Sequence, residues 1–186
     1  GTSGMQPPSE STLCASDGSM TSLDAVFAWA ERVRKRSELL QCVKQTSPRI
    51  FVSGLLRNNC DLALHYSVEV LKLAMLYGPT PFVNVFISLY ESGSATHDCT
   101  AEALLLLKRT LVALQVPHSI RVNQNSRLPD RARIDFLQEI RNEALNELYS
   151  AEREYNEVVY LSDTFFCASD IIRLLRHSDA SIKCGI

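Results

Sequence analysis

The chain has 186 residues, 46% of them hydrophobic, and a formal net charge of -2, which is typical of one well-buried globular domain. The balanced charge offers no electrostatic footprint for nucleic acid, so no nucleic-acid partner is expected. No run of 18 apolar residues predicts a membrane span, and the amino terminus lacks a secretory signal pattern. Because the chain opens with Gly1 rather than methionine, we expect upstream sequence, where any targeting segment would lie.

Six cysteines are scattered along the chain without a close pair of the kind that zinc sites use. A zinc site is therefore not expected. Their even number would permit disulfides in an oxidising compartment, and buried free thiols in an α/β core account for them equally well. The cysteines therefore do not indicate whether the protein resides in an oxidising or a reducing compartment.

Three regions follow one another along the chain. Residues 1–21 are rich in Ser, Thr, Gly and Pro and lack apolar periodicity, which predicts a disordered lead-in. Residues 22–46 predict an amphipathic helix that packs against the domain from outside. Residues 47–186 alternate strand-like and helix-like segments, which is typical of right-handed βαβ units. The predicted fold class is α/β, with a Rossmann-like, mostly parallel sheet and helices on both faces.

The elements of this α/β region are predicted in chain order. They are a strand at 50–55, a helix at 59–78, a strand at 82–90, a helix at 98–115, a strand at 116–122, a helix at 134–148, a strand at 158–163, a helix capped by Ser169 and a strand from 180. The sequence ends on a strand, with nothing left to cover that part of the sheet. We therefore expect a domain truncated at its carboxyl terminus.

The helix at 134–148 carries a cation in its predicted apolar face. When the helix is wound at about 100° per residue, its apolar residues fall on one arc: Ile134, Leu137, Ile140, Ala144, Leu145 and Leu148. Arg141 lies within the same arc, and an arginine on a packed face is costly to desolvate without an anionic partner. The alternative is that Arg141 extends past the core and pairs with Glu143 or Glu147.

Polar and small residues stand at the ends of the predicted strands. They are Ser53 and Gly54 in the first strand, Glu91 and Ser92 at the second, and Ser162 and Asp163 at the fourth. The four apolar residues before Ser162 predict a strand that is covered on both faces. Ligands of open α/β sheets bind at this edge, where an acid can hold base, ribose or a divalent ion while an arginine neutralises phosphate. The set suits a nucleotide-linked sugar, although Asp163 as a cap of the next helix is the simpler alternative.

Competing motifs are weak or absent. Neither G-x-G-x-x-G nor a P-loop follows the first strand, which disfavours a nicotinamide site or a P-loop nucleotide site. His97, Asp98 and Cys99 are catalytic residue types, but adjacent residues do not form a nucleophile and base pair by being neighbours, and Asp98 suits a helix cap.

Several segments together carry a family resemblance. They are Ile50 to Leu56, Asn84 to Ser94, Arg133-Ile134 with Leu137, Arg141-Asn142 with Ala144-Leu145, Val159 to Asp163, and Lys183 to Gly185. In order and spacing they resemble the fungal cryptococcal mannosyltransferase and capsule-associated protein family, glycosyltransferase family 69, over about residues 49–186. The run Val-Phe-Ile-Ser-Leu-Tyr-Glu-Ser is the strongest single match.

The resemblance implies a GT-A nucleotide-sugar fold and a metal-dependent glycosyltransferase. It implies GDP-mannose as donor, a glycan as acceptor, Mn²⁺ or Mg²⁺ as cofactor, and an α-1,3-mannosyl linkage made with retention. It also implies a lumenal place at a Golgi or other secretory-pathway membrane, with any amino-terminal anchor upstream of this chain. The alternative is a catalytically inactive GT-A-like module that binds a nucleotide sugar or serves as a scaffold.

The resemblance also assigns roles by position, without naming a catalytic residue. It makes Asp163 the metal ligand, places Arg141 and Asn142 at the donor's phosphate or sugar, lines the nucleoside end with Glu91 and Ser92, and lets the backbone approach the donor at Ser53 and Gly54. The chain departs from the D-x-D triplet of many GT-A enzymes. Leu161 and Phe165 occupy the positions two before and two after Asp163, so the second acid of the triplet is missing.

Overall fold

The computed structural model describes residues 49–77, 82–123, 132–150 and 154–176, together with Ala28 and Arg32. Within them a four-stranded sheet has the order β3-β2-β1-β4, and all of its pairs are parallel. This confirms the predicted α/β class. The predicted lead-in, the helix at 22–46 apart from the helical Ala28 and Arg32, and the strand from 180 lie outside the described residues.

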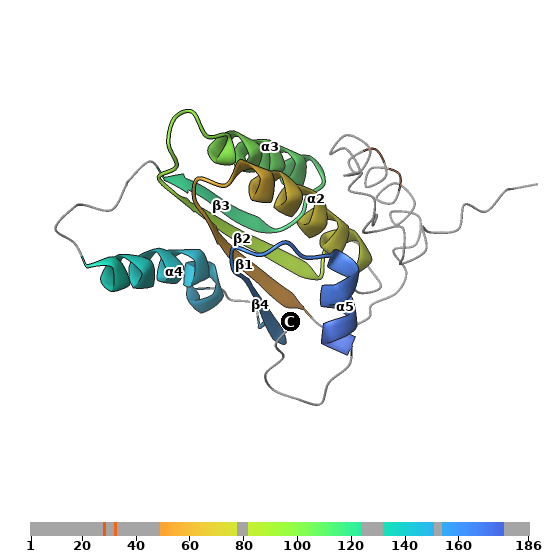
Figure 1. Cartoon of the computed structure of the whole chain (residues 1–186). Helices are drawn as coiled ribbons and strands as arrows, with labels where there is room; N and C mark the ends of the chain where they lie inside the picture. Colours follow the sequence, from red (N-terminus) through yellow and green to blue (C-terminus); the bar gives the residue numbers. More distant parts are fainter. Residues whose placement is uncertain are drawn as a thin grey trace, which may run out of the picture.

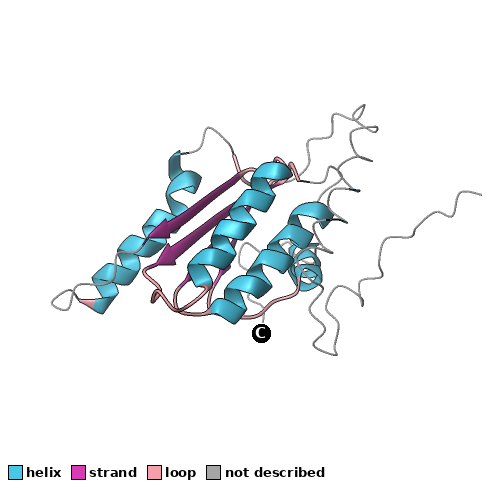
Figure 2. Cartoon of the chain, turned by 90° about the horizontal axis from the view of Figure 1, so that it is seen from above, coloured by secondary structure: helices cyan, strands magenta, loops and turns pink. Residues whose placement is uncertain are grey.

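Strands and helices alternate as predicted. Their bounds are β1 (Ile50–Leu56), α2 (Cys60–Leu76), β2 (Val85–Ser92), α3 (Thr100–Ala113), β3 (His118–Asn123), α4 (Arg133–Ser150), β4 (Glu157–Leu161) and α5 (Ala168–Arg176). Helices α2 and α3 cover one face of the sheet and α4 covers the other (Figure 1). Helix α5 packs beside α2. Seen from above, α2, α3 and α4 run along the strands (Figure 2).

The main core lies between the sheet and α2. Because successive side chains of a strand point to opposite faces, Ile50, Val52 and Leu56 of β1 enter this core, whereas Ser53 faces α4. Helix α2 is buried along most of its length, since the sheet, α3 and α5 surround it. A smaller cluster under α4 contains Tyr90, Phe136, Ile140 and Ala144.

Two strands start later than predicted. Residues 82–84 form a turn in which Phe82 has a positive φ of 68°, so β2 begins at Val85. Gln115 also has a positive φ, of 58°, and the turn it makes after α3 delays β3 to His118. In both places the apolar pattern of the strand begins before the chain has left the turn, so strand pairing starts two or three residues later than the pattern predicts.

The prediction that the strand before Ser162 is covered on both faces is wrong for the described residues. Strand β4 lies at the edge of the sheet, paired with β1, and ends at Leu161. Val159 and Leu161 pack on the main core, but Val158 and Tyr160 are 50% and 39% exposed. The physical reason is the position of α4, which packs mainly over β1 and β2.

Candidate functional site

The carboxyl ends of β1, β2 and β4 form the edge on which the predicted site was placed. Strand β1 lies between β2 and β4, so the order of the strands reverses at β1. Ligands of open α/β sheets bind outside the carboxyl ends of the strands at such a reversal. We call the exits of these three strands, residues 56–59, 91–94 and 162–164, the carboxyl edge.

Ser53 and Ser88 seat α4 on the sheet. Their hydroxyls donate to the carbonyl oxygen of Ala144 at 3.2 and 2.6 Å, and all three residues are buried. Ser53 therefore lies within β1, below the carboxyl edge, and its side chain contacts a helix. Its predicted role toward a donor stays a prediction.

Gly54 lies in β1 against Tyr66 of α2. A Cβ at this position would stand 2.9 Å from Leu89 Cδ2, 3.4 Å from Tyr66 Cε2 and 3.5 Å from Leu161 Cβ. The space that glycine leaves is thus filled by neighbouring side chains, and the structure gives Gly54 a packing role.

We expect Gly54→Ala to lower the free energy of unfolding by about 1–3 kcal/mol, because the added methyl group overpacks a filled site. Urea denaturation measures the change. A double-mutant cycle with Leu89→Val checks the cause, because shortening Leu89 removes the contacted atom. The loss of stability in the double variant should then be smaller than the sum of the losses in the two single variants. Fully additive costs would contradict this explanation.

Glu91 and Ser92 are buried at the end of β2, with exposed fractions of 1% and 2%. The Glu91 carboxylate accepts a hydrogen bond from the backbone N–H of Ser94, which folds the exit of β2 back on itself. Both side chains are thus buried within the carboxyl edge, and Glu91 holds the backbone of the loop that follows.

Arg141 and Asn142 are both exposed, so the prediction that Arg141 lies on the packed face of its helix is wrong. The buried face of α4 instead runs through Phe136, Ile140 and Ala144. Ile140 and Ala144 also belong to the predicted arc, so the buried face overlaps that arc and is rotated from its centre by less than the roughly 100° of one residue.

A pair of salt bridges explains this rotation. Arg121 on β3 binds Glu143 at 2.6 Å and Glu147 at 3.1 Å, which draws that flank of α4 toward the sheet. The opposite flank, with Arg141 and Ile134, turns to solvent, and Ile134 is 78% exposed. The alternative in which Arg141 pairs with these glutamates is not observed.

Asp163 is exposed directly after β4, at the predicted edge. Tyr66 on α2 fixes this exit, since its hydroxyl donates to the carbonyl oxygen of Ser162 at 3.0 Å. Burial raises the pKa of Tyr66 to about 12, and the nearby negative charge of Asp163 adds to the rise against a backbone hydrogen bond from Thr164. The Asp163 carboxylate therefore lies close to the amino-terminal half of α2.

The alternative role of Asp163 as a helix cap is not observed. Helix α5 begins at Ala168, and the backbone N–H of Ala168 donates to Glu69 Oε2 of α2 at 2.9 Å. Ser169, predicted to cap this helix, lies inside it. Glu69 does the capping, and Asp163 is left exposed at the edge.

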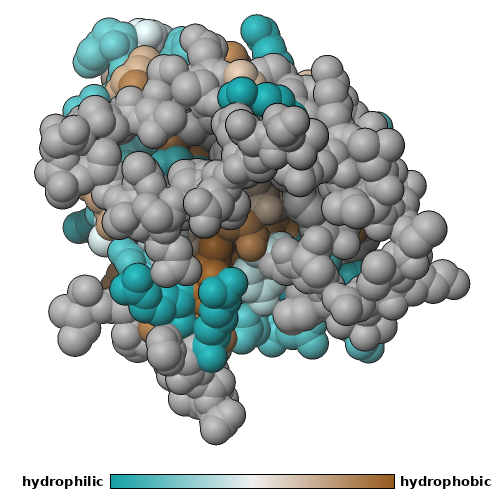
Figure 3. Space-filling model, turned by 90° about the vertical axis from the view of Figure 1, so that its right-hand side faces the viewer, coloured by the Kyte–Doolittle hydropathy of each residue, from teal (hydrophilic) through white to brown (hydrophobic). Residues whose placement is uncertain are grey.

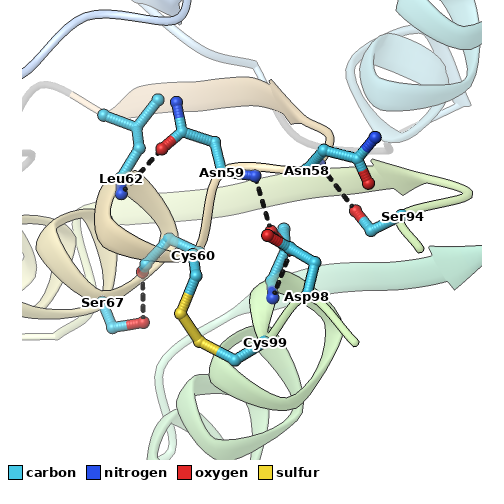
Figure 4. Close-up of a disulfide and its surroundings, with 10 residues drawn as sticks. Asn58, Asn59, Cys60, Leu62, Ser67, Ser94, Asp98 and Cys99 are labelled. Atoms are coloured by element: carbon cyan, nitrogen blue, oxygen red, sulfur yellow. Dashed lines mark hydrogen bonds between the residues drawn. A yellow bond between two sulfur atoms is a disulfide. The ribbon is translucent and has the colours of Figure 1, made fainter. Parts of the chain in front are cut away.

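The exits of β1 and β2 are joined by hydrogen bonds that the sequence reasoning did not anticipate (Figure 4). Asn58 has a positive φ of 47°. Its backbone N–H donates to Ser94 Oγ at 2.8 Å, and its Oδ1 accepts from the N–H of Ala95 at 2.7 Å. The available signal was the Asn58-Asn59 pair after a strand, because Asn tolerates positive φ and caps helices.

A disulfide and two more contacts complete this junction (Figure 4). Cys60 and Cys99 are disulfide-bonded across the starts of α2 and α3, with their Cα atoms 4.9 Å apart. Asn59 caps α2 through its Oδ1, which accepts from the N–H of Leu62 at 3.2 Å, and its own N–H donates to Thr100 Oγ1 at 2.9 Å. We call the Asn58, Asn59 and Cys60 contacts with residues 94–100 the loop clasp.

Asp98 also acts in structure at this junction. Its Oδ1 accepts from the Thr100 hydroxyl and, at 2.9 Å, from the backbone N–H of Thr100 at the start of α3. These hydrogen bonds, the hydroxyl's above all, hold the pKa of Asp98 below its usual value. Its neighbour Cys99 is in the disulfide. Asp98 and Cys99 are therefore both engaged in structural contacts, which does not support a catalytic group at residues 97–99.

The donor set for a divalent ion is limited in the part of the chain that the structure describes. No group of three or more His, Cys, Asp or Glu side chains occurs there that could hold a metal. Asp163 is an exposed carboxylate on an edge suited to phosphate, and Mg²⁺ is commonly held by one or two carboxylates together with substrate phosphates. One protein ligand therefore fits an ion that is shared with a diphosphate.

The other end of the sheet carries a separate hollow. A cavity of about 240 Å³ lies at the amino ends of the strands, and Arg49, Asn84, Gln115 and Tyr155 are among the residues that line it. Figure 3 views the molecule from the side on which the strands begin, and hydrophobic surface is visible there in a hollow flanked by hydrophilic residues. This cavity is remote from Asp163. Among the described helices, none is both long and apolar enough to cross a bilayer.

Comparison with known protein families identifies the family of this chain. A family model described as Cryptococcal mannosyltransferase 1 matches residues 49–186, the span over which the resemblance was expected. No significant match was found among curated proteins or among solved structures.

Proposed function

We infer function from the premise that this chain belongs to the Cryptococcal mannosyltransferase 1 family. Membership places it in a family of glycosyltransferases. We propose that the chain forms the donor-binding part of a metal-dependent enzyme that transfers mannose from GDP-mannose to a glycan acceptor, with an α-1,3 linkage and retention. The observation that carries the proposal is the exposed carboxylate of Asp163 at the reversal of the strand order.

Asp163 is the proposed protein ligand of Mn²⁺ or Mg²⁺. The diphosphate of the donor and water would complete the coordination, as is usual for hard cations at phosphate sites. A bound ion would supply Lewis-acid stabilisation of the departing nucleoside diphosphate. Tyr66, which anchors the exit of β4 through Ser162, positions the carboxylate.

The remaining predicted contacts are kept as proposals, with roles adjusted to their burial. Arg141 and Asn142 are exposed on α4, from which they are proposed to reach the donor's phosphate or sugar. Buried Glu91 and Ser92 are proposed to line the nucleoside end by shaping the exit of β2. Buried Ser53 and Gly54 are proposed to keep the strand and its covering helices close beneath the donor.

A lumenal position in the Golgi or another secretory compartment is proposed as well. The Cys60–Cys99 disulfide supports it, because disulfides persist in oxidising compartments and are rare in the cytosol. Cys167 is also disulfide-bonded. A membrane anchor, if the complete protein has one, is proposed to lie upstream of this chain.

Calorimetric titration of the full chain with GDP-mannose, with and without Mn²⁺, tests the function. We expect binding that depends on the metal and that weakens at least about tenfold, or about 1.4 kcal/mol, in Asp163→Ala. Thermal unfolding should be unchanged, because Asp163 is exposed. The matched control is Asp135→Ala, which removes an exposed aspartate of α4. Equal titration curves for Asp163→Ala and the parent chain would count against the assigned edge.

The alternative of a catalytically inactive nucleotide-sugar-binding or scaffold module is favoured by one observation. The described residues offer a single exposed carboxylate at the edge and no cluster of three metal-ligating side chains. Incubation of the chain with labelled GDP-mannose and mannoside acceptors separates the two functions. Metal-dependent binding without transfer to any acceptor would support the module.

A further inference from the structure

Arg57 and Asp163 follow neighbouring strands at the same edge of the sheet. Strands β1 and β4 pair in parallel, with Gly54 opposite Leu161. Arg57 comes three residues after Gly54 and Asp163 two residues after Leu161, so both lie just beyond the last paired position. Both are exposed. A cation and an anion thus flank the reversal of the strand order, where ligands of such sheets bind.

The guanidinium of Arg57 forms no ion pair with another residue in the described part of the chain. Among the cations there, Lys72 pairs with Glu69, and Arg121 pairs with both Glu143 and Glu147. Arg121 of β3 is therefore neutralised by α4, whereas the positive charge at the exit of β1 is available to a ligand. An exposed arginine fork suits phosphate oxygens, because its N–H donors match them two at a time.

The backbone that carries Arg57 is held on both sides. The strand β1 precedes it, and the loop clasp begins at the next residue, where Asn58 bonds to Ser94 and Ala95. The disulfide at Cys60 ties the same segment to α3. A ligand that binds Arg57 therefore has to order only the side chain, which lowers the entropic cost of binding.

We propose that Arg57 binds the diphosphate of the nucleotide-sugar donor, opposite the carboxylate of Asp163. The proposal rests on the proposed function and adds a residue that the sequence reasoning did not assign. In this arrangement Arg57, after β1, binds phosphate oxygens directly. Asp163, after β4, binds them through the divalent ion.

The test compares Arg57→Gln, Arg57→Lys and the parent chain by calorimetry with GDP and with guanosine, both in the presence of Mn²⁺. We expect Arg57→Gln to weaken GDP binding about 10- to 100-fold, as for a lost hydrogen bond to a charged group, and to leave guanosine binding unchanged. Arg57→Lys should lie between the two, because it keeps the charge and loses the fork. Arg109→Gln, on the exposed side of α3, is the matched control.

The outcomes are distinguishable. Unchanged GDP binding in Arg57→Gln, together with its loss in Asp163→Ala, would overturn the role of Arg57 and leave the proposed function in place. An equal loss of GDP and guanosine binding would also overturn it, because it would indicate a disturbed loop rather than a lost phosphate contact. Absence of GDP and GDP-mannose binding in the parent chain would overturn both proposals.

Discussion

Replacing Glu69 with alanine should lower the free energy of unfolding by about 3–5 kcal/mol, the cost of breaking a buried ion pair from one side. Glu69 and Lys72 are joined at 2.8 Å with side chains only 5–6% exposed. The second carboxylate oxygen accepts the backbone N–H of Ala168, where α5 begins. The change therefore removes the carboxylate from a buried ammonium and from the first turn of α5 at once. Chemical denaturation followed by circular dichroism measures the loss.

Two further variants separate these contributions. Glu69→Gln keeps a hydrogen-bond acceptor for Ala168 and removes the charge, so it should cost less than Glu69→Ala. The double variant Glu69→Leu with Lys72→Met replaces the pair by apolar side chains and should cost less than Glu69→Ala, because it leaves no unpaired ammonium and loses only the acceptor for the Ala168 N–H. A cost below about 1 kcal/mol for Glu69→Ala would show that the pair contributes little.

Removing the Cys60–Cys99 disulfide should have an effect of similar size. The bridge closes a segment with a sequence separation of 39, and the chain-entropy relation for such a loop gives about 4 kcal/mol. We expect the Cys60→Ala, Cys99→Ala double variant to lose about this much stability in denaturant titrations. The hydrogen bonds of Asn58 and Asn59 hold the loops in the folded state but do not restrict the unfolded chain, so they do not replace the bridge.

Reduction provides the control. A thiol reductant should lower the stability of the parent chain. In the double variant the bridge of Cys167 is the one left among the described cysteines, so the difference between the two responses measures the Cys60–Cys99 bridge. Identical denaturation midpoints for the parent chain and the double variant would contradict the predicted role of this disulfide.

Much of the fold could be predicted from local pattern. The alternation of β-branched strands with leucine-rich helices predicted the parallel sheet, and the strand that ends before Asp163 placed that carboxylate at the carboxyl edge. These features depend on residues close in sequence, where periodicity and helix signals are informative. The family resemblance from the same segments is confirmed by the match over residues 49–186.

The remainder depended on partners that are distant in sequence. The rotation of α4 that exposes Arg141 follows from the salt bridges of Arg121, and the seating of that helix follows from Ser53, which is 91 residues from its partner Ala144. The loop clasp joins residues 36–41 positions apart. Helical periodicity alone does not contain these contacts, so it placed Ile140 and Ala144 correctly on the buried face but also placed exposed Ile134 and Arg141 there.

The loop clasp gives the carboxyl edge unequal stiffness. The exits of β1 and β2 are joined to each other by a covalent bond and several hydrogen bonds, whereas residues 162–164 after β4 are held by hydrogen bonds such as that of Tyr66 with Ser162, and the next cross-link along the chain is at Cys167. Rearrangement when a ligand enters therefore costs least on the β4 side. Arg57 belongs to the rigid half of the edge, and Asp163 belongs to the compliant half, which can adjust its distance to a bound cation.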